Sequence, residues 1–192
     1  MVKTKEKILK VGAEIIAHES LRKFTAKNLA KKIGISDAAI FKHFSSMNEI
    51  AEEIILRYTN ECILRTKEAV ALGKTPIEKM EKILEGHMEL LEKTRGIIPI
   101  ICFEFSRSDK RSLKRKIHEF LEEYGNILKE VIREGIKKGE FRDDIDVDEA
   151  AFSLIGFMQG KAFQWFLKGK KGKIIRDPET VKKLILYGLK KV

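Results

Sequence analysis

The sequence predicts an all-α protein, and two observations carry that prediction. Apolar residues recur every three to four positions, as in the run Ile8, Val11, Ile15 that opens the chain. No stretch shows a sustained alternation of apolar and polar residues, and no Asn-Gly or Asp-Gly pair signals a hairpin. The periodicity predicts nine helices, at residues 3–19, 26–33, 37–43, 47–72, 76–93, 97–105, 109–137, 147–168 and 178–191.

Several of these helices begin with capping residues. Thr75 is followed by Pro76 and Glu78, which supply an N-cap, a proline at the first helical position and the acid of a capping box. Asp146 and Asp177 are the predicted N-caps of the last two helices. These signals place the starts of three helices independently of the apolar period.

The region between the fifth and seventh helices carries two expected interruptions. Pro99 lacks a backbone N–H and is expected to kink or break the helix at 97–105. Ser108 and Asp109 are expected to begin the next helix. Three short helices thus precede a series of mostly longer ones, which predicts an N-terminal domain at residues 1–46 and a helical domain at residues 47–192.

Composition narrows the class of protein. The 192 residues are 43% hydrophobic, enough for a sizeable core, and 39 Lys and Arg against 29 Asp and Glu give a net charge of +10 that attracts polyanions. Cys62 and Cys102 match no ligand spacing, and isolated buried thiols are favoured over a disulfide. No secretory signal is visible, and the longest uncharged run, at 150–160, is too short for a bilayer. We expect a cytoplasmic protein without a metal ion or cofactor.

The segment from Thr25 to Phe44 has the pattern of a helix-turn-helix. Thr25 is a good N-cap for the helix at 26–33, and Gly34 follows where a tight turn needs a positive φ. Ser36 is a second good N-cap and opens the helix at 37–43. Two short helices joined by a glycine-containing turn are typical of DNA-binding proteins.

The second of these helices has a predicted outward face. Ile40 and Phe44 define the buried stripe, so Ala38 and Lys42 point away from it. Small side chains allow close approach to base edges, and a lysine reaches a guanine edge or a phosphate. Thr25 and Lys27 are placed to meet a phosphate at a helix N-terminus. The predicted DNA-binding residues are Thr25, Lys27, Ser36, Asp37, Ala38, Ala39, Phe41, Lys42 and His43.

Charge is concentrated around this motif. Residues 20–47 contain six basic side chains and only one acidic one, Asp37. This excess is half of the net charge of the chain in under a fifth of its length. The alternative is a generic three-helix bundle with a solvated basic surface. It is disfavoured because the turn, the caps, the small outward residues and the charge all agree.

The residues from Phe24 to Ser36 and from Ile40 to Phe44 resemble the TetR (tetracycline repressor) family. The family often has Tyr where Phe41 stands and Lys where Met47 stands, so two polar contacts to phosphate are missing here. The resemblance implies a homodimer with one DNA-binding head per subunit. It also implies C-terminal helices that form the dimer interface and enclose a pocket for a small molecule whose binding releases DNA.

The C-terminal helices carry the candidates for these further roles. The last two helices have broad apolar faces suited to a dimer interface, although an ordinary internal core remains the alternative. The predicted interface residues are Leu154, Met158, Ala162, Trp165, Leu184 and Gly188. A pocket needs apolar walls with a few polar groups. Its candidate lining residues, each of which could also be plain core, are Tyr58, Cys62, His87, Met88, Phe103, Phe120, Tyr124 and Phe157.

The leading hypothesis is therefore a dimeric repressor that binds a palindromic operator in double-stranded DNA and is released by an unknown small-molecule effector. The alternative from another class is a helical small-molecule-binding protein or enzyme whose basic head is not a specific DNA reader. No phosphate loop, HExxH motif or nucleophile elbow supports an enzyme. A regulator that works without an effector, or that activates transcription, also stays open.

Overall fold

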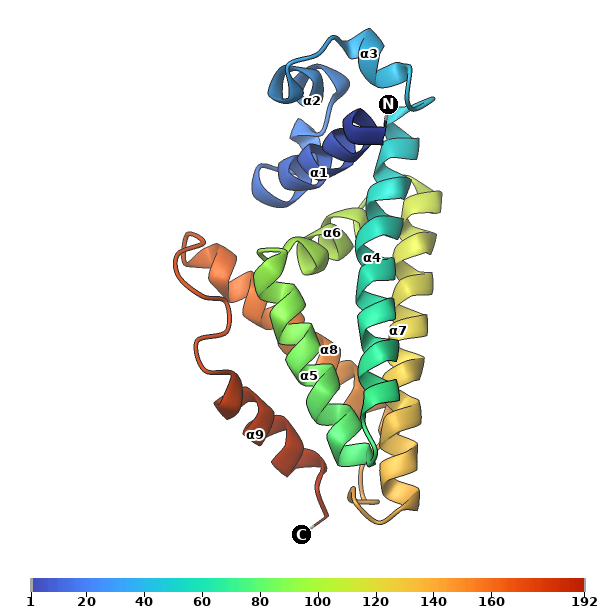
Figure 1. The fold of residues 1–192 in the computed structure, drawn as a ribbon, viewed down its shortest axis with the longest axis vertical. Helices are drawn as coiled ribbons and strands as arrows, with labels where there is room; N and C mark the ends of the chain where they lie inside the picture. The colour runs from blue at the N-terminus through green and yellow to red at the C-terminus, as the bar shows by residue number, and fades with distance from the viewer. Residues whose placement is uncertain (1, 192) are drawn as a thin grey trace. The chain divides into compact units, whose positions relative to one another are not determined.

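The computed structural model describes residues 2–191, and its ribbon is all-helical (Figure 1). A short 3-10 turn, η1 (Leu21–Lys23), separates the first two helices. The α-helices of the described residues are α1 (Val2–His18), α2 (Ala26–Ile33), α3 (Asp37–Phe41), α4 (Met47–Leu72), α5 (Pro76–Lys93), α6 (Ile97–Ser106), α7 (Arg111–Lys137), α8 (Val147–Leu167) and α9 (Pro178–Leu189). The predicted fold class and the nine helices are confirmed.

The predicted N-caps are also confirmed. The Thr75 hydroxyl accepts a hydrogen bond from the Glu78 backbone N–H at 3.2 Å, and the Asp146 carboxylate accepts one from the Glu149 N–H at 2.8 Å. Asp177 caps α9 through the backbone N–H groups of the first turn. Each acceptor satisfies a donor that the first helical turn cannot pair internally.

Two details between α5 and α7 differ from the expectation. The helix α6 runs without interruption from Ile97 to Ser106, so Pro99 does not break it. Pro99 is the third residue of α6, and the first four N–H groups of a helix have no partner inside it, so the missing N–H costs nothing there. Ser108 accepts a hydrogen bond from the Lys110 N–H at 3.2 Å, but α7 begins only at Arg111.

The chain forms two compact units. The first joins the residues up to Thr59 with Ile97–Glu119, and the second joins Asn60–Gly96 with the chain from Phe120 onward. The helices α4 and α7 each contribute their first part to the first unit and their remainder to the second. The core of the first unit is made of fully buried aliphatic side chains, which are Ile8, Ile15, Ile16, Leu29, Ile40, Ile50 and Ile54.

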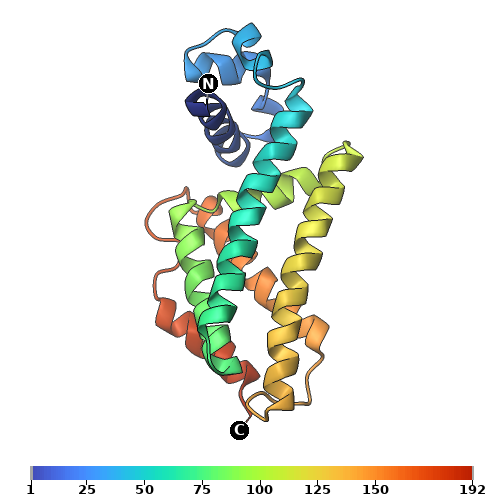
Figure 2. The ribbon, with the colours of Figure 1, turned by 45° about the vertical axis from the view of Figure 1, so that its right-hand side comes forward.

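In the first unit, α1 packs against α2 and α6 (Figures 1 and 2). Gly12 allows α1 to approach its neighbours closely. A Cβ at this position would lie 2.9 Å from Cδ1 of Ile54 and 3.0 Å from the ring of Phe24. The position therefore requires glycine or a rearranged core.

In the second unit, α5 lies beside α9 (Figures 1 and 2). Phe141 is fully buried, and a Cβ on Gly135 would come within 2.1 Å of its ring. The Phe141 backbone also forms an isolated antiparallel bridge with Lys190. These contacts tie the end of α7 to the end of the chain. Within residues 2–191, no helix has the length and apolar character needed to span a membrane.

Candidate nucleic-acid interface

The turn between α2 and α3 has the geometry that the sequence predicted. The Thr25 hydroxyl accepts from the Asn28 N–H at 3.3 Å and fixes the start of α2. Gly34 ends α2 in the left-handed conformation, with φ 80° and ψ 37°, and its N–H donates to the Ala30 carbonyl. The Ser36 hydroxyl then accepts from the Ala39 N–H at 3.2 Å and starts α3. Local signals alone therefore fix the two helices and the turn.

The burial pattern of α3 separates an inner face from an outer one. Ile40 and Phe44 are buried in the first unit, as predicted. Ala38 and Lys42 are exposed, and Phe41 presents 44% of its surface to solvent. The helix is shorter than predicted and ends at Phe41, because Lys42 and His43 already belong to the turn that follows.

Most of the predicted DNA-binding residues lie at the surface. Ala39 and His43 are half-buried, while the others are exposed, namely Thr25, Lys27, Ser36, Asp37, Ala38, Phe41 and Lys42. Together α3 and the turn after it present the exposed Ala38, the half-buried Ala39, the ring of Phe41 and the cation of Lys42. The short side chains on this face let the helix approach base edges closely, and polar side chains at its rim can contact phosphates.

The basic side chains around α3 are largely unneutralised. Lys32 forms an ion pair with Glu19 at 2.8 Å, and this contact lowers the pKa of the Glu19 carboxyl. Within the described residues, Lys27, Lys31 and Lys42 have no carboxylate within ion-pair distance and are exposed. Unpaired lysines beside an exposed helix make a surface that attracts a polyanion and releases its counterions.

The turn after α3 is held by its own capping contacts. The Glu49 carboxylate accepts hydrogen bonds from the Ser45 N–H at 2.5 Å and from the Ser45 hydroxyl at 2.6 Å. These bonds lower the pKa of the Glu49 carboxyl. The contacts fix the path of the chain from α3 into α4 and so hold the outer face of α3 in place.

The predicted ligand-lining residues do not gather around one cavity. Tyr58 and Phe103 belong to the first unit, where Phe103 is exposed and stacks under the guanidinium of Arg107. The remaining six belong to the second unit. Four of those six are buried, namely Cys62, Met88, Phe120 and Tyr124, while His87 and Phe157 are half-buried.

In the second unit, His87 and Tyr124 form a polar pair. The His87 Nδ1 lies 2.6 Å from the Tyr124 hydroxyl, and the Tyr124 ring stacks on Phe120. Desolvation lowers the pKa of His87 to about 4 and raises the pKa of Tyr124. Burial raises the pKa of the nearby Cys62 thiol to about 12. All three side chains are therefore neutral at pH 7.

A small hollow adjoins this pair and is lined in part by Cys62 and His87. Its volume is about 10 Å³, which is room for one water molecule at most. Neither Cys62 nor Cys102 forms a disulfide, and both thiols are buried. Among the described residues, no three His, Cys, Asp or Glu side chains gather as they would around a metal ion.

The predicted dimer residues fall into two groups. Leu154, Met158, Ala162 and Trp165 are buried inside the second unit, so their side chains face its own core. Leu184 and Gly188 are exposed on α9. The helical period showed that both helices carry apolar stripes. It did not show which stripe packs inside the subunit and which stays exposed.

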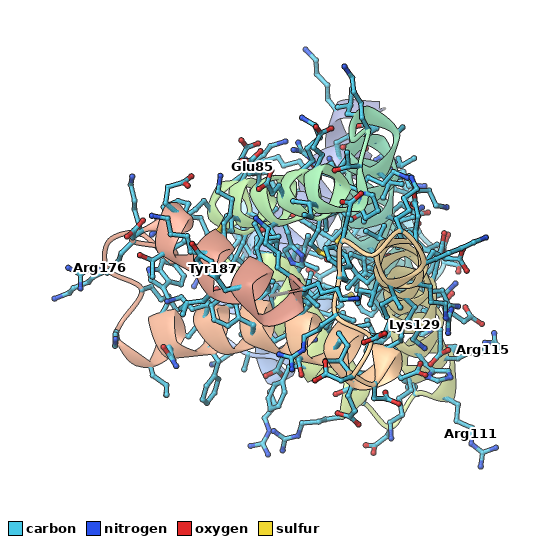
Figure 3. The ribbon with its side chains drawn as sticks, turned by 90° about the horizontal axis from the view of Figure 1, so that it is seen from below. Glu85, Arg111, Arg115, Lys129, Arg176 and Tyr187 are labelled. Carbon is cyan, nitrogen blue, oxygen red and sulfur yellow. The ribbon has the colours of Figure 1, made fainter. Side chains whose placement is uncertain are left out.

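The structure shows a second apolar stripe, most of whose residues were not predicted as interface residues. On α8 it consists of Phe152, Phe163 and Leu167, and on α9 Tyr187 joins Leu184. Tyr187 is the aromatic side chain labelled on α9 in Figure 3. All five are more than half exposed. A signal was present, because Phe152, Gly156, Phe163 and Leu167 also recur at helical spacing.

Two family models match almost the whole chain. Residues 8–54 match the description "Bacterial regulatory proteins, tetR family", and residues 57–188 match "YsiA-like protein, C-terminal region". The first match contains the complete helix-turn-helix. The second covers more than half of the chain, where no residue-level resemblance had been visible.

Known proteins of similar length give the same result. The fatty acid metabolism regulator protein of Bacillus subtilis is 25% identical over 182 residues, which cover 95% of this chain and 93% of that protein. The ketosteroid transcriptional regulator KstR2 of Mycobacterium tuberculosis has a similar structure, with a TM-score of 0.85, 20% identity and 98% and 96% of the two chains covered.

A third comparison is the structure of the transcriptional regulator FadR from Bacillus subtilis in complex with stearoyl-CoA. Its TM-score is 0.79 at 24% identity, over 95% of this chain and 98% of that one. At this level of identity the two structures establish a shared fold. Together with the two family models, the caps, the turn and the exposed face of α3 lead to one conclusion: the chain belongs to the TetR family of bacterial transcriptional regulators.

Proposed function

We propose that the chain is a homodimeric repressor that places α3 in the major groove at each half of a palindromic operator. The observation that carries the proposal is the outer face of α3, where Ala38, Lys42 and Phe41 are exposed above a buried Ile40. In this proposal residues 1–46 form the DNA-binding domain and residues 47–192 form the ligand-binding and dimerisation domain. Two heads in one dimer would read half-sites about one helical turn or somewhat more apart.

Each predicted DNA-binding residue has a proposed role. Ala38 and Ala39 face the base edges, and Lys42 reaches a guanine or a phosphate. Residues on the rim of this face would contact phosphate or sugar and so fix the register without reading sequence. These rim residues are Thr25, Lys27, Ser36 and His43, while Asp37, whose carboxylate would repel a phosphate, and Phe41 have contacts to base edges as their proposed role.

A second copy of the chain is the proposed partner of the exposed apolar stripe on α8 and α9. Leu184 and Gly188 keep the role that the sequence analysis gave them, and Phe152, Phe163 and Tyr187 take the place of the buried residues. Large exposed apolar side chains on both helices are typical of an interaction surface. A symmetric dimer would bury this stripe against its own copy.

The proposed effector is a long-chain acyl-CoA. Support comes from the two Bacillus subtilis relatives, one named for fatty acid metabolism and one bound to stearoyl-CoA. The proposed pocket is the region around Cys62, His87, Met88 and Tyr124 in the second unit. Since the hollow there holds about 10 Å³, an acyl chain would have to stabilise a more open arrangement, and it would shift the population only by binding that arrangement better.

Operator binding with the DNA upstream of its own gene tests the proposal. Fluorescence anisotropy at several salt concentrations would compare the wild type with Lys42→Ala and with Lys137→Ala, an exposed lysine on α7, as the matched control. We expect salt-dependent binding that Lys42→Ala weakens by roughly 10-fold or more, while the control stays near wild type.

The outcome also separates the alternatives. Sequence-independent weakening by Lys42→Ala would make Lys42 a phosphate contact and not a base reader. Salt-insensitive or absent binding would contradict the proposal and favour a helical ligand-binding protein with an incidental basic head. Release of the operator by stearoyl-CoA is the expected result for the effector, and unchanged binding at saturating stearoyl-CoA would contradict that part alone.

A further inference from the structure

A second cationic region lies far along the chain from the DNA-binding motif. Residues 161–176 contain six basic side chains and no acidic one. They comprise the last turns of α8 and the loop that leads toward α9. A charge run on its own is usually a solvated surface, so only its arrangement in the fold can indicate a role.

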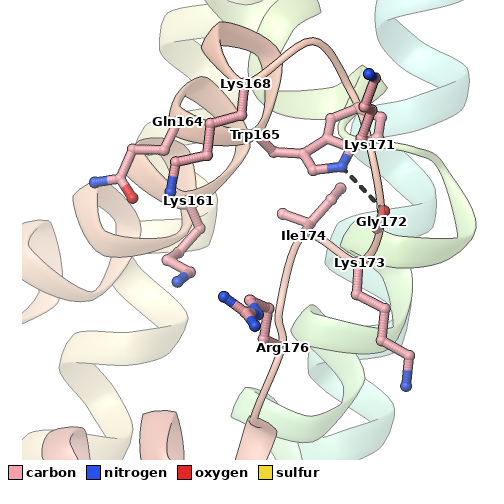
Figure 4. A pocket seen from close by; sticks show the side chains of 9 residues that line it. All are labelled: Lys161, Gln164, Trp165, Lys168, Lys171, Gly172, Lys173, Ile174 and Arg176. Carbon is pink, nitrogen blue, oxygen red and sulfur yellow. Dashed lines mark hydrogen bonds between the residues drawn. The ribbon is translucent and has the colours of Figure 1, made fainter.

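The structure arranges five of these cations around one hollow. Its volume is about 370 Å³, and Figure 4 shows its lining side chains, which come from α8 and from the loop: Lys161, Lys168 and Arg176 lie on one side, while the amino groups of Lys171 and Lys173 point away from them. The cations are Lys161, Lys168, Lys171, Lys173 and Arg176. Gln164, Trp165, Gly172 and Ile174 complete the wall. The volume lies in the range of small-molecule sites, and the wall combines apolar surface with polar groups.

Tertiary hydrogen bonds fix the loop in this position. The indole N–H of Trp165 donates to the Gly172 carbonyl at 3.1 Å, a contact drawn in Figure 4. Farther along, the Ile175 N–H donates to the Glu92 carboxylate on α5 at 2.7 Å. Ile174 and Ile175 are buried. The loop backbone is therefore held by the core, so the cations that line the hollow start from fixed positions.

Trp165 itself is part of the hollow's support. It is buried, and the guanidinium of Arg95 lies 4.6 Å from its ring centroid. The same Arg95 donates to the Lys170 carbonyl at 3.3 Å. Arg95 therefore contacts both the indole of Trp165 and the backbone of the loop. It also places a further cation near the hollow.

The five cations lack the neutralising partners that lysines have elsewhere in the unit. Lys182, on α9, lies 2.7 Å from carboxylate oxygens of both Glu179 and Glu85, and these contacts raise the pKa of its amino group above the ordinary lysine value. Within the described residues, none of the five cations that line the hollow has a carboxylate at ion-pair distance. An anion that enters the hollow therefore meets cations that no carboxylate of the protein neutralises.

We propose that this hollow binds the phosphate-bearing headgroup of the effector. The inference rests on the proposed acyl-CoA response and extends it, since it assigns the several negative charges of coenzyme A to Lys161, Lys168, Lys171, Lys173 and Arg176. A concave site lined by several cations suits a ligand with several phosphates, because each phosphate oxygen accepts charge-assisted hydrogen bonds. A free nucleotide with the same phosphates shares this chemistry.

Calorimetric titration of the full chain at low salt tests the inference with four probes. Coenzyme A and 3′-dephospho-coenzyme A differ by one phosphate, stearate lacks the headgroup, and adenosine 3′,5′-bisphosphate lacks the pantetheine arm together with one phosphate of the diphosphate. The test variant is Lys168→Gln, Lys171→Gln, Arg176→Gln. The matched control is Lys74→Gln, Lys137→Gln, Lys191→Gln, which removes the same charge from exposed lysines outside the hollow.

We expect coenzyme A to bind more tightly than its dephospho form. The test variant should lose roughly 10- to 100-fold in affinity for coenzyme A, while the control changes less than about twofold. Stearate affinity should be equal in all three proteins. Binding of adenosine 3′,5′-bisphosphate as tight as that of coenzyme A would show that a free nucleotide is the source of the phosphates and would overturn the assignment to the effector.

Unchanged affinity of the test variant for coenzyme A would overturn the inference. If operator affinity falls instead, the cations contact DNA, and if the dimer dissociates, they belong to the subunit interface. Either of these results with unchanged coenzyme A binding refutes the headgroup site. Failure of the proposed function is a separate result, because it appears as absent operator binding by the wild type, which does not depend on this hollow.

Discussion

The two cationic stretches of this chain have similar charge, but the first surrounds an exposed helix and the second borders a hollow. Residues 20–47 carry six basic side chains and one acidic one, and residues 161–176 carry six and none. In the first stretch the charges surround the exposed α3, whose small side chains let a large flat partner approach. In the second, five of the six basic side chains line a hollow of about 370 Å³. Charge attracts an anion in both places, but the shape of the backbone decides which anion fits.

The hydrogen bonds that hold the two regions also differ in how far apart their partners lie in the sequence. The α2–α3 turn is held by bonds between residues three or four apart, such as Thr25 with Asn28 and Gly34 with Ala30. The hollow is held by bonds across long separations, such as Ile175 with Glu92 and Arg95 with Lys170. The head should therefore tolerate changes elsewhere in the chain, while the hollow depends on the packing of the second unit.

The largest expected effect is on the head. Ala38→Glu places a carboxylate on the face that approaches DNA, where like charges cost several kcal/mol, so operator affinity should fall by about a thousandfold. Fluorescence anisotropy measures this, with Ala71→Glu on the exposed end of α4 as the charge-matched control. If Ala38→Glu binds the operator as tightly as Ala71→Glu, α3 does not enter the groove and the contrast between the two regions fails.

The next largest effect is a loss of stability in the second unit as the pH falls. The pKa of His87 in the folded protein, about 4, lies below its ordinary value of 6.5, so the unfolded chain binds more protons between these values. The stability from this group is present above pH 6.5 and is lost as the pH falls toward 4. Between pH 7 and pH 5 we expect it to contribute a loss of about 2 kcal/mol.

Urea unfolding at pH 7, 6 and 5 measures that loss. His87→Gln removes the titrating group and keeps an acceptor for the Tyr124 hydroxyl. The variant should therefore show a flatter dependence of the unfolding free energy on pH than the wild type. Parallel curves for the two proteins would mean that His87 ionises as freely in the folded state as in the unfolded chain.

A smaller effect is expected from the indole that holds the loop. Trp165→Phe keeps an aromatic ring but removes the hydrogen bond to the Gly172 carbonyl. Loss of one such bond corresponds to about 1 kcal/mol, so coenzyme A should bind about fivefold more weakly. Calorimetry measures this loss, and operator affinity in the absence of the ligand serves as the control. Unchanged coenzyme A affinity would show that the loop does not need this bond to present its cations.

The smallest effect is local to the recognition helix. Ser36→Ala removes the N-cap of α3 and should lower the free energy of unfolding by about 1 kcal/mol, whereas Ser36→Asn keeps a good cap. Thermal unfolding followed by circular dichroism compares the two variants. Equal destabilisation by both would indicate that the hydroxyl does more than cap the helix, for example by contacting another part of the head.

Most features that depend on neighbouring residues were predicted correctly from the sequence. Features that depend on residues far apart in the chain were not. Thr25, Gly34 and Ser36 could be assigned in advance because a cap or a positive φ depends on the nearest few residues. The effect of Pro99 was misjudged although the start of α6 at residue 97 was predicted correctly, because a proline at the third position of a helix lacks only an N–H that has no partner inside the helix. The candidates for the ligand pocket include Phe103, which is exposed and in the other unit, because apolar character alone does not reveal tertiary neighbours.

The sequence by itself determined the all-α class, the nine helices and the helix-turn-helix, because periodicity and caps are written in adjacent residues. Only the tertiary structure decided which stripe of α8 faces the core, since Trp165 and Phe163 are equally apolar and differ only in what packs against them. It also decided that the lysines and arginine near residue 170 surround a hollow. That arrangement depends on Glu92, 83 positions from its partner Ile175, and no local pattern in the chain encodes such a contact.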